Sequence, residues 1–347
     1  VFEQKLIDAG FDTNGLNGNI LQSEAEAITQ LNFRNNFNPD TSLIIKDATG
    51  IESMPNLTSL VLGNHALTSI DVTNNPKLET LDLFYSNISV IDLSNNNLIK
   101  RLDLAHNNLT EINVTNLTQL ESLFLNNNNT IELIDLSNNT LLTTAWLSYN
   151  NFSTIDVSNN NLLVTLRLSG NDLSQIDISN LGELDRFDIQ QNNISSLDVS
   201  NNTKLRYLDF KYNEVSSIDV SGNLELIEFS AFDNLLTSEI DLSLHKKLTK
   251  VILGTNQLTK INLNNGANTN LTAIDFRSNP NLSCIQVDDV SFATSNFTNI
   301  DNSSLYSTDC FTPKVTISDT NDKPFFISQT AFYMRNQIHE LSRIRYE

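Results

Sequence analysis

The sequence has few of the residues on which small catalytic and metal sites depend. Its 347 residues include 2 cysteines, 4 histidines, 6 prolines and 1 tryptophan, and 21 Lys and Arg stand against 41 Asp and Glu. So few cysteines exclude a framework of several disulfides and a zinc site with several thiolate ligands. The net charge of −20 and the pI near 4.4 oppose binding to nucleic acid or to anionic membranes, so a cationic or neutral partner is expected.

Long hydrophobic runs and catalytic motifs are also missing. No apolar run approaches the ~20 residues that span a bilayer, so we expect no membrane insertion. The histidines are scattered, and the sequence contains no glycine-rich phosphate loop and no nucleophile elbow. These absences predict a soluble protein that is not an enzyme.

What the sequence does contain is a repeat. The phrase Leu-x-x-Leu-x-Leu-x-x-Asn-x-Leu recurs, followed by a second phrase that reads Ile-Asp-Val-Ser-Asn-Asn. Eleven copies follow one another in steps of 21 to 23 residues, beginning at Leu57, Leu78, Ile99, Leu120, Leu142, Leu163, Leu184, Leu205, Leu226, Leu248 and Leu271. A unit this short cannot bury its apolar face alone and must stack on its neighbours, so the repeat predicts one elongated solenoid.

Each first phrase has the alternation of a short strand. In the fourth copy Leu123 and Leu125 are expected to face inward, and Ser122, Phe124 and Asn126 outward. The Asn that follows the strand is expected to bond backbone groups freed as the chain turns, forming an internal ladder. The first two copies carry His65 and Ser86 at this position instead. The other nine copies carry the Asn: Asn107, Asn128, Asn150, Asn171, Asn192, Asn213, Asn234, Asn256 and Asn279.

These phrases resemble the leucine-rich repeat family. The short 21-residue form with Ile-Asp-Val-Ser-Asn-Asn is similar to the bacterial, internalin-like branch found in surface and secreted proteins of the Bacteroidetes, over about residues 28 to 311. The resemblance implies an α/β-type repeat solenoid with a parallel sheet on its concave face. It also implies a non-enzymatic binding or adhesion module that is extracellular or on the bacterial cell surface.

The ends of the chain depart from the repeat. We predict a helical N-terminal cap over residues 1–27, the array over 28–283, a C-terminal cap over 284–311, and a linker with an amphipathic tail helix over 312–347. Cys284 and Cys310 flank one irregular segment, which predicts a single disulfide that closes the C-terminal cap. In the N-terminal cap, Ser23 to Glu26 form a capping-box pattern that predicts a helix ending near Leu31.

The N-terminal cap also contains an Asn- and Gly-rich loop. It resembles an EF-hand calcium loop with one extra residue, Leu16, and the oxygen ligands would be Asp12, Asn14, Asn17, Asn19 and Glu24. The other interpretation is a turn that joins two capping helices. Calcium is the only cofactor that the sequence suggests.

The second phrase places acids and hydroxyls in columns on the outer surface. Three interpretations stay open: Asx turns within each repeat, calcium between the acids, or ice or ordered-water binding through the hydroxyls. The acidic column is Asp71, Asp92, Asp135, Asp156, Asp177, Asp198, Asp219 and Asp241.

The second to fifth repeats place aromatic residues where the strands should face solvent. The predicted ligand site is Phe84, Tyr85, His106, Phe124, Trp146 and Tyr149, with Arg167 stacked on Trp146. Such rings suit a protein or peptide partner, and a polysaccharide at the cell surface is the alternative. A third interpretation is that the rings only cover one another.

Overall fold

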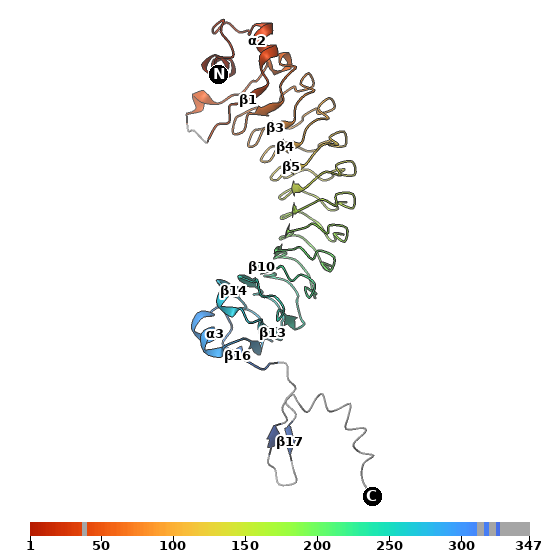
Figure 1. Ribbon diagram of the computed structural model, residues 1–347, viewed down its shortest axis with the longest axis vertical. Helices are drawn as coiled ribbons and strands as arrows, with labels where there is room; N and C mark the ends of the chain where they lie inside the picture. The colour runs from red at the N-terminus through yellow and green to blue at the C-terminus, as the bar shows by residue number, and fades with distance from the viewer. Residues whose placement is uncertain (37–39, 311–315, 319–323, 327–347) are drawn as a thin grey trace.

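The computed structural model of the protein describes residues 1–36, 40–310, 316–318 and 324–326. Over residues 1–310 the chain coils into a curved solenoid whose strands line the inner wall of the arc (Figure 1). The predicted tail helix lies outside the described residues, as does most of the predicted linker. Within that linker β17 (Thr316–Ser318) pairs antiparallel with β18 (Pro324–Phe326).

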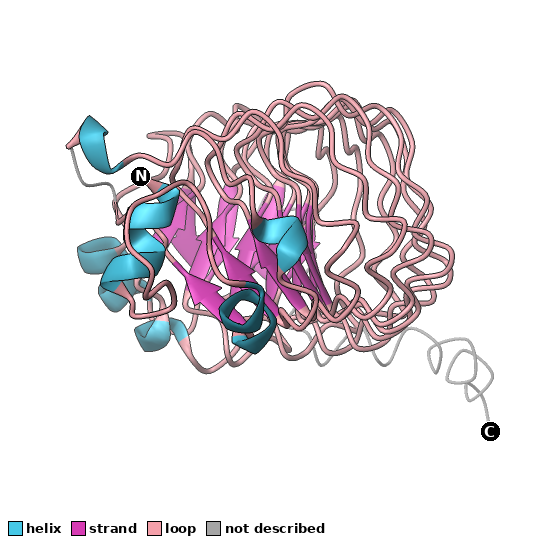
Figure 2. Cartoon of the chain, turned by 90° about the horizontal axis from the view of Figure 1, so that it is seen from above, coloured by secondary structure: helices cyan, strands magenta, loops and turns pink. Residues whose placement is uncertain are grey.

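The inner wall is one parallel sheet of twelve strands, in which each strand pairs in register with the next. Viewed along the solenoid, the strands form one wall and the loops form the other (Figure 2). The predicted solenoid with a concave parallel sheet is therefore confirmed. The strands are β1 (Gln30–Asn32), β2 (Ser59–Val61), β3 (Thr80–Asp82), β4 (Arg101–Asp103), β5 (Ser122–Phe124), β6 (Thr144–Trp146), β7 (Thr165–Arg167), β8 (Arg186–Asp188), β9 (Tyr207–Asp209), β10 (Glu228–Ser230), β12 (Lys250–Ile252) and β14 (Ala273–Asp275).

The core lies between the two walls. The middle residue of each concave strand is buried, and the outer two are mostly half-buried, as strand alternation requires. Leu123 and Leu125 are fully buried, as predicted. In β6, Ala145 stands where the other strands carry Leu, Phe, Val or Ile, and the same repeat buries Phe152 instead.

The predicted asparagine ladder runs through the interior beside this sheet. Asn128, which is 2% exposed, donates from Nδ2 to the carbonyls of Leu104 (3.1 Å) and Leu125 (2.8 Å). Its Oδ1 accepts the backbone N–H of Leu109 at 3.0 Å. The side chain thus satisfies three backbone groups that the turn leaves without partners, two of them on the preceding repeat.

His65 performs the same task in the first unit. Its Nε2 donates to the carbonyl of Phe33 (2.7 Å), and its Nδ1 accepts the backbone N–H of Ile45 (3.2 Å). Burial lowers the pKa of His65, which favours the neutral ring that this bonding needs. Ser86, in the second unit, is buried with a hydroxyl that has no partner among the described residues.

A second ladder uses the last Asn of the second phrase. Asn96 donates from Nδ2 to the carbonyls of Val72 and Asn75, both at 2.9 Å. In the unit where His245 takes this position, its Nε2 donates to the carbonyl of Val220 at 3.0 Å. The six ladder residues are all fully buried: Asn75, Asn96, Asn139, Asn160, Asn202 and Asn223.

The acidic column makes Asx turns. Asp135 is typical, because its Oδ1 accepts the backbone N–H of Ser137 at 2.9 Å, and the equivalent bond recurs in the other copies. Hydrogen bonds from the hydroxyl and N–H of Ser137 lower the pKa of Asp135. The turn interpretation of this column is confirmed.

The second phrase forms strands only towards the C-terminus. Two of them join two strands of the C-terminal cap in a separate parallel sheet: β11 (Ile240–Asp241) and β13 (Lys260–Asn262) from the array, then β15 (Cys284–Gln286) and β16 (Leu305–Ser307) from the cap. The cap adds α3 (Val290–Asn296), whose N-cap Asp289 accepts the N–H groups of Ser291 and Phe292. Cys284 and Cys310 form the predicted disulfide, with their Cα atoms 5.8 Å apart.

The N-terminal cap is helical, as predicted, but its second helix differs. The cap contains α1 (Phe2–Asp8) and α2 (Gln22–Ala27), and the 3-10 turns η1 (Thr41–Leu43) and η2 (Ile51–Ser53) follow it. A third 3-10 turn, η3 (Asn268–Asn270), lies far along the array between β13 and β14. The predicted capping box is wrong, because α2 has Leu21 at its N-cap and no side-chain cap bond. It ends before Leu31 because residues 30–32 pair with β2. Among the described helices, none has the length and apolar character to cross a membrane.

The ladder gives a first prediction. Asn128→Ala should lower the free energy of unfolding by about 2 kcal/mol, since it leaves buried backbone groups without partners. Urea denaturation would measure the loss. Asn108→Ala, at an exposed position one repeat earlier, is the matched control and should change stability little. Equal effects of the two substitutions would contradict the structural role of the ladder.

Candidate functional site

The concave face carries a depression of about 600 Å³, which we call the Trp146 depression. It spans strands β4 to β8 and the turn after β3. Its lining residues are Phe84, Arg101, Asp103, Ala105, His106, Phe124, Asn126, Thr144, Trp146, Thr165, Arg167 and Arg186. Five of the seven residues predicted for the ligand site are among them.

Two aromatic rings and two arginines form the centre of the depression. Phe124 and Trp146 face each other across β5 and β6, with ring centroids 5.1 Å apart in an edge-to-face arrangement. Arg101 lies over the Phe124 ring (4.3 Å from Cζ to the centroid), and Arg167 lies over Trp146 (4.2 Å), as predicted. Trp146 is half-buried, and its Nε1–H has no acceptor among the described residues. These contacts hold the ring in place on the open face.

A second aromatic cluster comes from the preceding repeats. The Phe84 and His106 rings are 5.2 Å apart, and Tyr85 lies 5.5 Å from His106. Phe84 and His106 line the Trp146 depression, whereas Tyr85 is 52% exposed and does not. Partial burial lowers the pKa of His106.

Tyr85, His106 and Tyr149 do not lie on strands, which corrects the prediction from simple alternation. Each occupies the turn after the strand with a φ of 53° to 56°. Residues other than glycine rarely adopt this left-handed backbone conformation. Nearly every repeat has it at this position, so the geometry of the turn imposes it. Equivalent residues include Asn64, Asn127, Gly170, Gln191, Tyr212, Asp233, Thr255 and Ser278.

Tyr149 contacts residues of the two following repeats along this edge of the sheet. Its ring packs against Gly170, where an added Cβ would come within 2.5 Å of the ring. Its hydroxyl lies 3.5 Å from Oε1 of Gln191, two repeats further on. Gly170 also has a φ of 65°, so this position needs glycine both for its backbone and for the space above it. Tyr149 is therefore not among the residues that line the Trp146 depression.

The sequence prediction missed several lining residues. Arg101, Thr144, Thr165 and Arg186 occupy the first position of their strands and align in register. Their alignment follows from the repeat, but the predicted site rests mainly on aromatic residues at the third strand position and in the turn. The other missed residues are Asp103, Ala105 and Asn126.

Asp103 lines the depression, and a second carboxylate, Asp82, lies beside it on the preceding strand. Asp82 and Asp103 pair in register and are 4% and 6% exposed. Arg34 lies 3.4 Å from Asp82, and Arg101 lies 3.2 Å from Asp103. Burial, with a smaller contribution from the charge of Asp82, raises the pKa of Asp103 to about 6. Keeping the buried carboxyl of Asp103 ionised therefore lowers the stability of the native state at neutral pH.

The predicted calcium loop lies in the N-terminal cap. Asp12 is 2% exposed; its Oδ1 accepts the N–H of Asn14 at 3.1 Å, and its Oδ2 is buried with no partner in the described part of the chain. Glu24 accepts bonds from the N–H and hydroxyl of Thr13 on Oε1, and its Oε2 is likewise buried with no partner among these described residues. The loop thus holds two buried carboxylate oxygens whose bonding capacity is unused.

The three asparagines of the loop bond to one another. Asn14 donates from Nδ2 to Oδ1 of Asn19 (3.0 Å), and Asn17 donates from Nδ2 to Oδ1 of Asn14 (2.9 Å). All five predicted ligands therefore belong to one hydrogen-bonded loop. No cluster of three His, Cys, Asp or Glu side chains exists in the described part of the chain, so a cation here would depend on amide and carbonyl oxygens.

The buried acid gives a prediction for stability against pH. An unfolded Asp titrates near ~3.9, so a folded pKa of about 6 means that the native state binds more protons between these values and loses stability as the pH rises through them. Asp103→Asn should therefore raise the free energy of unfolding at pH 7 by on the order of 2 kcal/mol. The gain should vanish near pH 4.

Thermal unfolding at both pH values would measure this gain. Asp135→Asn is the control, because the pKa of that exposed acid is lowered and its substitution offers no gain at pH 7. A gain for Asp103→Asn that is the same at both pH values would show that its charge is not the cause.

No protein-family profile matches the sequence, and a search of curated proteins finds no relative. Solved structures are similar. Internalin InlJ of Listeria monocytogenes has a TM-score of 0.65 at 25% identity, over 78% of this chain and 71% of that one.

Two further structures have the same solenoid. Internalin InlF of Listeria monocytogenes has a TM-score of 0.66 at 23% identity, over 90% of this chain and 96% of its own. The plant receptor RGFR1, solved in complex with RGF2, has a TM-score of 0.53 at 20% identity, over 68% of this chain and 48% of the receptor. The chain is therefore a leucine-rich repeat solenoid with short repeats of the internalin type.

Proposed function

We propose that the protein is a non-enzymatic extracellular binding module that recognises a protein or peptide partner through the Trp146 depression. The observation that carries the proposal is the stack of Phe124, Trp146 and two arginines on the open side of a rigid sheet. These residues make no contribution to the solenoid core. Trp and Arg are the residue types that most often dominate the energy of protein interfaces.

The similar structures support this proposal. The plant receptor was solved with RGF2, and it is described as a peptide hormone receptor. The internalins provide the same repeat type in bacterial proteins. The disulfide between Cys284 and Cys310 fits an oxidising compartment and hence an extracellular or cell-surface position.

A polysaccharide partner is the alternative, because sugar rings also stack on aromatic side chains. The two partners differ in what the charged residues contribute. Salt should slow association with a protein partner, whereas it should change binding to a neutral glycan little.

The central test is Trp146→Ala. Removing a hot-spot ring costs at least ~2 kcal/mol of binding, so affinity for a partner found in a peptide-library and glycan-array screen should fall about thirtyfold or more. The melting temperature should change little, because the ring lies outside the core. Surface plasmon resonance on the purified variant would measure the loss.

Phe232→Ala is the matched control for that substitution. Phe232 is half-buried beyond the depression, where it packs edge-to-face on Tyr212 (5.6 Å between centroids). The Phe232→Ala substitution should leave the affinity for the partner nearly unchanged. A partner that tolerates Trp146→Ala but not Phe232→Ala would place the site elsewhere on the sheet.

We also propose that the N-terminal loop binds calcium and so stabilises the cap. The proposal is supported by the buried oxygens of Asp12 and Glu24 that have no partner among the described residues, because carboxylate oxygens of this kind are the ligands that calcium prefers. Asn14, Asn17 and Asn19 would complete the ligand set with amide and carbonyl oxygens. Two carboxylates make a low-affinity site, of the kind that binds at ~10⁻⁴ to 10⁻³ M in extracellular modules.

Calcium at about 10 mM should then stabilise the native state by about 1.4 to 2.7 kcal/mol. Removing it with a chelator should lower the melting temperature, and Glu24→Ala should abolish the difference. Glu26→Ala, an exposed acid in the same helix, is the control and should preserve it. A melting temperature of the wild-type protein that does not respond to calcium would leave the plain turn as the correct interpretation.

A further inference from the structure

Two arginines in the Trp146 depression, Arg167 and Arg186, form no ion pair with any described residue. The structure describes six arginines, and four pair with a carboxylate: Arg34, Arg101, Arg206 and Arg277. Arg167 and Arg186 are the exceptions, since no carboxylate oxygen of the described residues lies within 4 Å of either guanidinium. In a chain with twice as many acids as bases, two neighbouring unpaired arginines need an explanation.

These two arginines lie on adjacent strands. Arg167 ends β7 and Arg186 begins β8, a diagonal step of about 8 Å given strand spacings of ~4.8 Å and rises of ~3.3 Å per residue. Both line the Trp146 depression and a smaller one of about 80 Å³ beside it. Burial and, to a smaller degree, the charge of Arg186 lower the pKa of Arg167, and the charge of Asp188 opposes them with the smallest effect. Asp188 thus offsets only part of the repulsion between the two guanidiniums.

Aromatic rings hold both guanidiniums in position. Cζ of Arg167 lies 4.2 Å from the Trp146 ring, and Cζ of Arg186 lies 3.8 Å from the Tyr207 ring. Stacking occupies one face of a guanidinium but leaves the N–H groups at its edge free to donate. Nε of Arg167 and Nε1 of Trp146 are both buried donors without an acceptor among the described residues. The two arginines are thus preorganised for a group that carries several acceptor oxygens.

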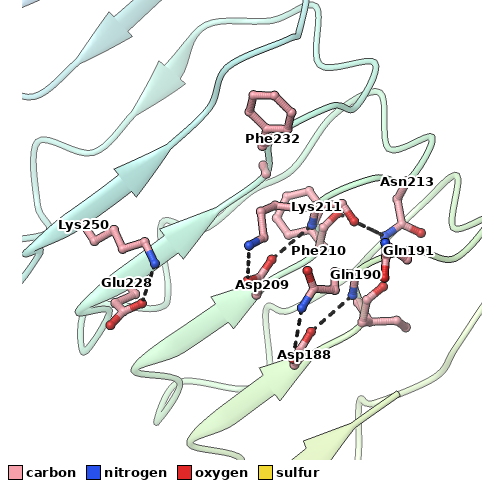
Figure 3. Close-up of polar contacts among 12 residues, drawn as sticks. Asp188, Gln190, Gln191, Asp209, Phe210, Lys211, Asn213, Glu228, Phe232 and Lys250 are labelled. Atoms are coloured by element: carbon pink, nitrogen blue, oxygen red, sulfur yellow. Dashed lines mark hydrogen bonds and ion pairs between the residues drawn. The ribbon is translucent and has the colours of Figure 1, made fainter. Parts of the chain in front are cut away.

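The neighbouring acids do not fill this role. Asp209 is paired with Lys211 at 3.0 Å, and Glu228 with Lys250 at 3.3 Å (Figure 3). Asp188 pairs in register with Arg167, but its carboxylate accepts from Gln190. At physiological ionic strength the Debye length is ~8 Å, so the distant acids that make the chain −20 are largely screened at this point.

We infer that Arg167 and Arg186 bind a carboxylate of an acidic segment of the protein partner, whose apolar side chain lies on Trp146. This inference rests on the proposed function and adds the chemistry of the partner to it. It also differs from the expectation of a cationic or neutral partner, which net charge alone suggests. The local arrangement of charge, and not the total, decides which group enters the depression.

The test uses the only tryptophan of the chain as its reporter. Peptides are selected from a random displayed library against the wild-type protein in ~150 mM salt, and synthetic copies are titrated while the emission of Trp146 is followed. Selected peptides should carry Asp or Glu beside an apolar residue. Replacing that Glu by Gln should weaken binding at least about tenfold, the loss of one charge-assisted hydrogen-bonded pair.

Substitutions in the protein should give the matching result. Arg167→Gln and Arg186→Gln should each weaken binding of the acidic peptide about tenfold, and Arg→Lys at either position should restore part of it through the retained charge. Arg277→Gln, which removes an arginine paired with its own Asp275, is the control and should have no effect. The melting temperature of each variant shows that it is folded.

Any of the following results would overturn the inference. Neutral peptides that bind with full dependence on Trp146 would overturn it and leave the proposed function intact. A uronic acid polymer, polygalacturonate, is titrated in parallel; Arg167-dependent binding of this polymer with no peptide selected would replace the protein segment by an acidic polysaccharide. No change in Trp146 emission with any peptide or with the polymer would overturn both the inference and the proposed function.

Discussion

The structure depends on the satisfaction of backbone groups inside a chain that turns every few residues. Strands of three residues leave most of each repeat without sheet hydrogen bonds, so other donors must serve its buried carbonyls. Two columns of asparagine do this, one beside each wall, and their amides bond mainly to the preceding repeat. Leucine supplies the burial that makes the solenoid compact, and asparagine makes that burial compatible with a turning backbone.

Because the ladders and the core fix the backbone from within, the outward side chains of the concave strands are free to vary. β5, β6 and β7 share the same inward pattern, yet their third residues are Phe124, Trp146 and Arg167. A rigid sheet of this kind positions such side chains with little loss of entropy on binding, which is why function gathers there. The buried acid Asp103 and the unpaired arginines show that this face is not arranged for stability alone.

The sequence predicted the solenoid, the concave sheet, the first ladder and the disulfide, because each follows from a repeat or from a pair of residues. It also predicted Phe124, Trp146 and Arg167, since strand alternation places them outward. It did not predict the edge position of Tyr149, because a left-handed turn residue breaks the alternation. Arg186 is absent from the predicted site for another reason: it occupies the first position of its strand, whereas the predicted site rests mainly on the third position and the turn. The second asparagine ladder was also not predicted, although the phrase contains its residue in six copies.

The central claim is that the Trp146 depression is where a partner binds. A crystal structure of the protein with a selected peptide tests this most directly. The account predicts that an apolar side chain lies against Trp146 and that acceptor oxygens lie within hydrogen-bond distance of Arg167 and Arg186. A peptide bound on the outer loops or along the Asx turns, with the depression open to solvent, would contradict it.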